Sequence, residues 1–118
     1  MITREQFDTV YNGLAAQGWK QSTLPCGTCA YRDPTHAGRK CAVGHLIPDG
    51  HYDPVMDDDH TGVGIWGLGS FQNIGLLGNL THDEFQILQS THDNNPLPAD
   101  MKTAFDDLRK EWFPDDAD

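Results

Sequence analysis

Four residues in the first half of the chain have the types and spacing of a zinc site. Cys26 and Cys29 are separated by two residues, and Cys41 and His45 follow further along the chain. Three thiolates and one imidazole make a complete tetrahedral ligand set, and the Cys-x2-Cys spacing lets two sulfurs meet one ion. His36 could take the place of His45. The spacing allows a structural zinc site at these four residues; the alternative is that Cys29 and Cys41 are buried apolar residues.

Cys41 also permits a hypothesis of thiol chemistry. At the start of a short helix and next to two cationic side chains, its thiol pKa would be lowered. His45, His82 or His92 could then act as the general base. No local motif pairs the thiol with one of these histidines, and we therefore expect a binding protein rather than an enzyme.

The charge of the chain is strongly negative and unevenly distributed. The formal net charge is -10, from 18 acidic and 8 basic residues. No Lys or Arg occurs between Lys40 and Lys102. This distribution predicts a negative surface that attracts a basic partner, with solubility as the alternative explanation, and it disfavours direct binding of nucleic acid. The candidate contact residues are Asp49, Asp53, Asp57, Asp58, Asp59 and, as an aromatic anchor, Trp66.

Helices are predicted at both ends of the chain. Phe7, Val10, Tyr11 and Leu14 follow helical spacing after a capping box at 3–6. A second capping box at 81–84 begins another helix, and a last helix begins near residue 98, where Pro suits the first turn. Asn12-Gly13 weakens the first helix by propensity, so that packing of its apolar stripe must hold it.

The middle of the chain is predicted to contain short elements joined by loops. Residues 29–31 and 39–41 are candidate hairpin strands, and 41–47 favours a helical turn that ends at Pro48. Residues 49–80 are rich in Asp and Gly and predict loops with short elements. We expect Ile65, Trp66, Leu68 and Phe71 to pack as core under these loops, with an exposed Trp66 as an interface anchor as the alternative. The expected fold class is therefore α+β, with a small antiparallel hairpin or sheet packed by about three helices.

The size of the chain suits one domain. The 118 residues provide apolar side chains for a single core, which we assign to 1–114, with 115–118 as a disordered tail. No stretch reaches the length of a membrane helix and no secretory signal begins the chain. Together with an odd number of cysteines, these features predict a cytoplasmic protein that does not contact membranes.

Several segments resemble a group of small uncharacterised proteins encoded by tailed phages and prophages. The resemblance is carried by Cys29-Ala30-Tyr31-Arg32 and by Gly38-Arg39-Lys40-Cys41-Ala42-Val43-Gly44, which runs on into Leu46-Ile47-Pro48-Asp49 and Tyr52. It also includes the opening helix and residues 88–93. The resemblance implies no particular activity or catalytic residue.

Membership of such a group implies a class of role, because small acidic phage proteins without catalytic motifs often block a host surface that normally meets nucleic acid. We therefore expect an inhibitor or modulator of a basic host or antiphage-defence protein, of anti-CRISPR type, that acts in the host cytoplasm. The alternatives that stay open are a zinc-stabilised interaction module and a thiol-dependent enzyme that uses Cys41.

Overall fold

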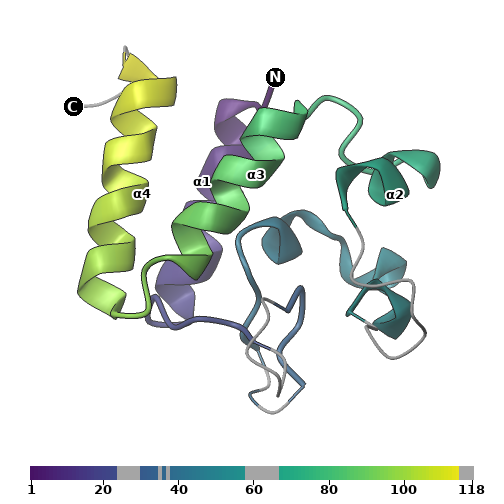
Figure 1. The fold of residues 1–118 in the computed structure, drawn as a ribbon, viewed down its shortest axis with the longest axis horizontal. Coiled ribbons are helices and arrows are strands. Elements are labelled where there is room, and N and C mark those ends of the chain that lie inside the picture. The colour runs from purple at the N-terminus through teal and green to yellow at the C-terminus, as the bar shows by residue number, and fades with distance from the viewer. Residues whose placement is uncertain (24–29, 35, 37, 58–66, 115–118) are drawn as a thin grey trace.

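The fold is built from helices joined by irregular segments (Figure 1). In the computed structural model, the residues described are 1–23, 30–34, 36, 38–57 and 67–114. The α-helices are α1 (Arg4–Ala16), α2 (Leu68–Asn73), α3 (His82–Asp93) and α4 (Pro98–Trp112). The described residues between α1 and α2 contain three short 3₁₀ helices, namely η1 (Val43–Leu46), η2 (Asp49–His51) and η3 (Pro54–Asp57). None of the helices in these described ranges is long and apolar enough to cross a membrane.

The predicted ends of the helices are confirmed. Thr3 and Gln6 form a complete capping box at α1, and Thr81 and Glu84 form another at α3. In each box the two side chains satisfy backbone N–H groups that the first turn leaves without partners. The helix α1 ends where predicted, before Gly18, whose φ of 71° is the left-handed conformation that glycine favours.

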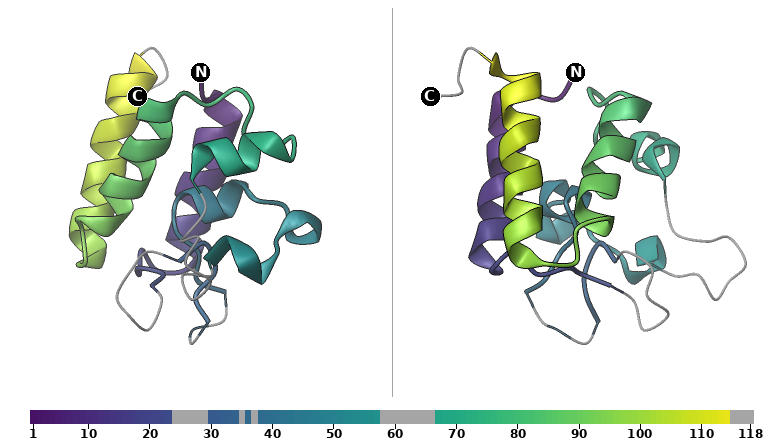
Figure 2. Two further views of the ribbon diagram at one scale, coloured as in Figure 1. Left: turned by 45° about the vertical axis from the view of Figure 1, so that its right-hand side comes forward. Right: turned by 60° about the vertical axis from the view of Figure 1, so that its left-hand side comes forward.

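Helices α1, α3 and α4 lie side by side, and the N-terminus and the C-terminal end of α4 are at the same end of this group (Figures 1 and 2). Helix α4 packs against both α1 and α3, and η1 packs against α1 and α3 from the other side. The apolar stripes that the sequence predicts form the centre of the core. Its fully buried members on the three helices include Phe7, Val10, Leu14, Leu88, Met101 and Phe105.

Aromatic and charged side chains fix α4 against α1. The ring of Trp19 meets Tyr11 edge to face at 4.8 Å, and the guanidinium of Arg109 lies 4.2 Å above the Tyr11 ring. The Tyr11 hydroxyl donates a 2.6 Å hydrogen bond to Asp106. Burial and this hydrogen bond together raise the pKa of Tyr11. The contacts hold α4 at a fixed position, so that its other face is presented to α3.

The prediction of an α+β fold with a small antiparallel hairpin or sheet is wrong, because the described residues contain no strand. Segments 30–33 and 39–41 do meet, since Cys41 N–H donates to Ala30 O and Asp33 N–H donates to Arg39 O. The backbone N–H groups of Tyr31 and Arg32, however, donate to the side chain of Asp57. A side chain has taken the donors that a neighbouring strand would need, so the two segments form no ladder.

The helical turn predicted for 41–47 is confirmed as η1, and two glycines explain its close packing. A Cβ on Gly44 would lie 2.2 Å from the carbonyl oxygen of Tyr31. A Cβ on Gly13, in the middle of α1, would lie 2.3 Å from Nδ1 of His45. The glycine that appeared to weaken α1 is therefore the place where η1 approaches the helix.

Candidate functional site

Of the described members of the zinc set, Cys41 lies in the interior and His45 is half-buried. Cys41 is fully buried, and the ring of His45 lies flat against Gly13 of α1. His45 Nε2 is 2.9 Å from Oε1 of Gln17. That oxygen can only accept, so Nε2 carries the proton and donates. Burial first, and then the positive charge of Lys40, lower the pKa of His45 to about 4, which leaves the ring neutral at neutral pH.

The zinc site stays a prediction. Cys26 and Cys29 lie outside the described residues, as do parts of the loop around His36. Within the described ranges, no three His, Cys, Asp or Glu side chains gather closely enough to hold a metal ion.

The thiol of Cys41 is enclosed by the core. Its exposure is 0%, and its neighbours in the core are Ala42 and Val43. No substrate can reach the sulfur in this conformation. The thiol hypothesis receives no support from the surroundings of Cys41.

His92 has the neighbours of a catalytic triad but not their geometry. Its Nδ1 is 2.9 Å from Oδ1 of Asp93, and its Nε2 accepts a 3.1 Å hydrogen bond from the backbone N–H of Ser22. The hydroxyl of Ser22 instead donates to Ala30 O. Because the imidazole meets an amide and not the hydroxyl, it cannot activate Ser22 as a nucleophile. The contacts join the segment after α1 to the end of α3.

Asp57 lies inside the protein and acts as a structural acceptor. Its carboxylate receives N–H groups from Tyr31 (2.7 Å) and Arg32 (3.1 Å) and the hydroxyl of Tyr52 (2.6 Å). Burial first, and then this hydrogen bond to Asp57, raise the pKa of Tyr52. With an exposure of 8%, Asp57 presents no charge to a partner, although the sequence suggested that it would.

Asp49 is on the surface but is paired. Its Oδ1 contacts the guanidinium of Arg32 and lies 3.5 Å from Nζ of Lys40. These cations, Lys40 first, lower the pKa of Asp49. Asp53 is exposed on the surface, whereas Asp58, Asp59 and Trp66 lie outside the described residues. Among the described members of the predicted contact set, Asp49 and Asp53 are exposed and Asp57 is buried.

A different acidic surface lies between α3 and α4, and the sequence analysis missed it. A groove between these helices has an upper chamber of about 270 Å³ and a lower chamber of about 390 Å³. Ile87 lines both chambers and is 39% exposed. The upper chamber is also lined by Met1, Ile2, Thr81, Asp83, Glu84, Trp112 and Phe113. The lower chamber is also lined by Ser90, Thr91, Asn94, Asn95, Ala104, Asp107, Leu108 and Glu111. We call this surface the α3–α4 groove.

Apolar side chains form the floor of the α3–α4 groove and carboxylates form its rim. Ile87, Leu108 and Trp112 supply apolar surface, while Asp107 and Glu111 are exposed along one edge of α4. No Lys or Arg lines either chamber. The sequence shows Asp107 and Glu111 four residues apart, on one face of a helix, but it could not show that α3 lies alongside.

The upper end of the α3–α4 groove is built by the docked N-terminal residues. Both oxygens of Glu84 accept from the backbone N–H of Ile2, at 3.0 and 2.9 Å. The terminal ammonium of Met1 donates to Asn79 O, which places the positive charge of this ammonium at the upper end of the groove. Burial alone would raise the pKa of Glu84, but the hydrogen bonds from Thr81 and Ile2 outweigh it and the pKa is lowered. Glu84 therefore stays ionised and holds the N-terminus in place.

No family model, curated protein or solved structure matches this chain. The α3–α4 groove itself has neither a metal-binding group nor a nucleophile with a base within its described lining. The apolar floor of the α3–α4 groove can bury apolar side chains of another molecule, and its carboxylates can form ion pairs with cations of that molecule.

Proposed function

We propose that this protein is a small acidic binding protein, and that the α3–α4 groove takes up a basic amphipathic helix of a partner protein. The observation that supports the proposal is an apolar floor edged by Asp83, Asp107 and Glu111, without Lys or Arg in its lining. A helix with apolar residues on one face and Lys or Arg beside them matches this arrangement, because such helices bind grooves through side chains at i, i+3, i+4 and i+7.

The two components of the groove have different roles in binding. Burial of Ile87, Leu108 and Trp112 against apolar side chains of the partner would supply most of the affinity. The carboxylates of Asp107 and Glu111 would attract the partner over a distance and select a cationic one. Binding should therefore weaken, without being abolished, as the salt concentration rises.

The class of partner follows from the charge and from the resemblance to phage proteins together. A basic protein that normally binds nucleic acid offers the cationic surface that this groove matches. A host nucleic-acid-handling protein or an antiphage-defence complex of CRISPR type, in the host cytoplasm, is the partner that we propose. The protein would then act as an inhibitor by covering a surface that nucleic acid otherwise occupies.

Partner capture tests the proposal. The full chain is immobilised in a host lysate, the enriched protein is identified and purified, and its affinity is measured by calorimetry. We expect a basic, nucleic-acid-binding protein. The double variant Asp107→Asn, Glu111→Gln should weaken its affinity by roughly fivefold, and Ile87→Ala by roughly tenfold.

The matched control is Glu5→Gln, which removes one negative charge from an exposed position in the first turn of α1, outside the α3–α4 groove. This variant should bind with nearly unchanged affinity. A partner of acidic character, or an affinity that the Asp107, Glu111 and Ile87 variants leave unchanged, would refute the proposed function.

A further inference from the structure

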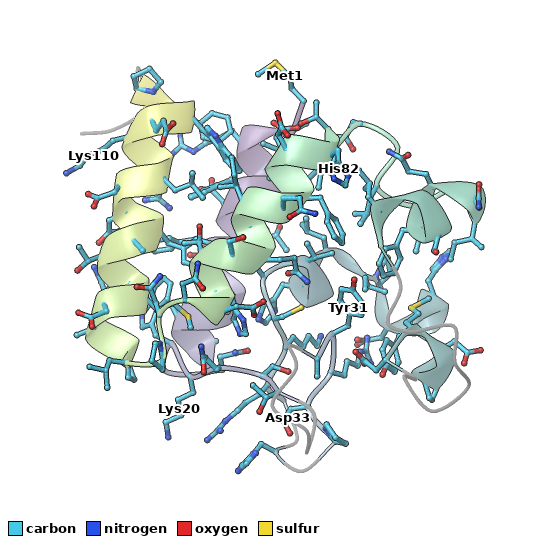
Figure 3. The ribbon with its side chains drawn as sticks, in the orientation of Figure 1. Met1, Lys20, Tyr31, Asp33, His82 and Lys110 are labelled. Atoms are coloured by element: carbon cyan, nitrogen blue, oxygen red, sulfur yellow. The ribbon has the colours of Figure 1, made fainter. Side chains whose placement is uncertain are left out.

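Cations gather at one end of this acidic protein. Three of its 8 basic residues, Lys20, Arg39 and Lys40, line a single pocket of about 460 Å³ beside the C-terminal end of α1. No carboxylate is among the lining residues, and the imidazole of His45 forms part of the wall. Figure 3 shows Lys20 at the end of the molecule opposite to Met1, so this pocket is remote from the upper chamber of the α3–α4 groove.

One side chain holds the backbone at two of the three cationic residues, Lys20 and Lys40. The amide nitrogen of Gln17 donates to the backbone carbonyls of Lys20 (2.7 Å) and Lys40 (2.9 Å). Its amide oxygen accepts from the backbone N–H of Lys40 (3.0 Å) and from His45 (2.9 Å). The backbones of two lysines that are distant in sequence are thus held on the same wall by Gln17, the C-cap residue of α1. The backbone of this wall is therefore held in place before any ligand binds.

The charges at the pocket are largely unneutralised. Lys20 and Arg39 form no ion pair within the described ranges, and Lys40 shares the exposed Asp49 with Arg32. The C-terminal end of α1 contributes only about half a negative elementary charge. Three formal positive charges therefore exceed the negative charge nearby, and the pocket is positive in a chain whose net charge is -10.

We propose that this pocket binds the phosphate group of a small phosphorylated molecule. The guanidinium of Arg39 offers paired donors to phosphate oxygens, and the ammonium groups of Lys20 and Lys40 add point charges. A single phosphate is favoured over a nucleic acid, because the net charge of the whole protein repels a long polyanion. The site is separate from the α3–α4 groove and does not depend on the proposed function.

Two titrating groups beside the pocket respond to the same positive potential. The pKa of His45 is lowered by burial first and by Lys40 second, and the pKa of Asp49 is lowered mainly by Lys40 and Arg32. The contribution of Lys40 has the sign of a nearby positive charge in both cases, since such a charge disfavours the imidazolium and favours the carboxylate, while burial is the larger cause for His45.

Titration of the isotope-labelled full chain with inorganic phosphate, followed by amide chemical shifts, tests the site. The perturbed amides should be those of Gln17, Lys20, Arg39 and Lys40. Lys20→Gln and Arg39→Gln should each weaken binding by roughly threefold to tenfold, and the double variant by more. Spectra of the variants that keep the dispersion of the core amides establish that each one is folded.

The matched control is Lys110→Gln, an exposed cation on α4 that forms no ion pair in the described part of the chain and that lies at the other end of the molecule (Figure 3). It should bind phosphate as the unmodified protein does. Equal weakening by the Lys110 and Lys20 variants would overturn the proposal, as would perturbation of amides outside the pocket. A nucleoside monophosphate should bind at least as tightly as inorganic phosphate. An oligonucleotide that binds more than roughly tenfold tighter than the monophosphate would overturn the proposal of a small ligand and indicate a nucleic-acid site.

Discussion

The contact between Gly13 and His45 predicts that the effect of Gly13→Ala on stability changes sign when the ring of His45 is removed. In an ordinary helix interior, Gly→Ala stabilises by about 1 kcal/mol, because alanine has the higher helix propensity. Here the new Cβ of Gly13→Ala would lie 2.3 Å from Nδ1 and 2.6 Å from Cγ and Cε1 of His45. The ring would have to move, and it would lose its hydrogen bond to Gln17.

The expected magnitude follows from these opposing terms. Overpacking and the lost hydrogen bond together cost about 2 to 3 kcal/mol, which exceeds the gain in propensity. Gly13→Ala should therefore destabilise the protein by about 1 to 2 kcal/mol. In a His45→Ala background the ring is absent, and the same substitution should stabilise by about 0.5 to 1 kcal/mol.

Urea unfolding of the four proteins of this cycle, followed by tryptophan fluorescence, measures the coupling. The interaction free energy between the two positions should be about 2 to 3 kcal/mol. An effect of Gly13→Ala that has the same sign and nearly the same size in both backgrounds would refute the packing that we describe.

Three further predictions concern stability. The pKa of His45 is about 4 in the folded protein, below its ordinary value of 6.5. Between pH 6.5 and pH 4 the unfolded chain therefore binds more protons than the folded one. The stabilisation is complete above pH 6.5 and is lost as the pH falls toward 4. The loss should be about 2 kcal/mol between pH 7.5 and 5, measured by urea unfolding, and His45→Gln should remove that slope. Asp57→Asn should cost about 2 to 3 kcal/mol, because an amide nitrogen would face the N–H donors of residues 31 and 32; a melting temperature that is unchanged would count against this. Glu84→Gln should destabilise by about 1 to 2 kcal/mol and speed hydrogen exchange at the Ile2 amide, with unaltered exchange as the contrary result. Since hydrogen bonds lower the pKa of Glu84, its contribution should also be lost as the pH falls through the folded pKa.

Local signals in the sequence predicted the helix ends well. The capping boxes at Thr3 and Thr81 need only residues three positions away, so the sequence contains the whole interaction. The helical turn at 41–47 was also predicted, and its burial agrees with its apolar composition.

Interactions between distant residues could not be predicted in this way. The run that begins at Asp57 looks like a solvated acidic surface, and nothing nearby in sequence shows that Asp57 accepts from Tyr31 and Arg32. The same hydrogen bonds explain why the expected hairpin does not form. Gly13 looked like a weakness of α1 because its neighbour, His45, belongs to another element.

The candidate site was missed for the same physical reason. Asp107 and Glu111 are visible as part of a helical stripe, but a groove requires a second wall, which α3 supplies only in the folded protein. The absence of Lys and Arg between Lys40 and Lys102 indicated a charged surface in the middle of the chain, but there Asp49 is paired with Arg32 and Lys40.

The most direct test of the central claim is chemical-shift mapping of the isotope-labelled protein with its captured basic partner. Our account predicts that the amides of Ile87, Ala104, Leu108 and Glu111, along the α3–α4 groove, shift first and that these shifts diminish as salt is added. Shifts that are confined to the surface around Asp49 and Asp53, with the groove unperturbed, would contradict it.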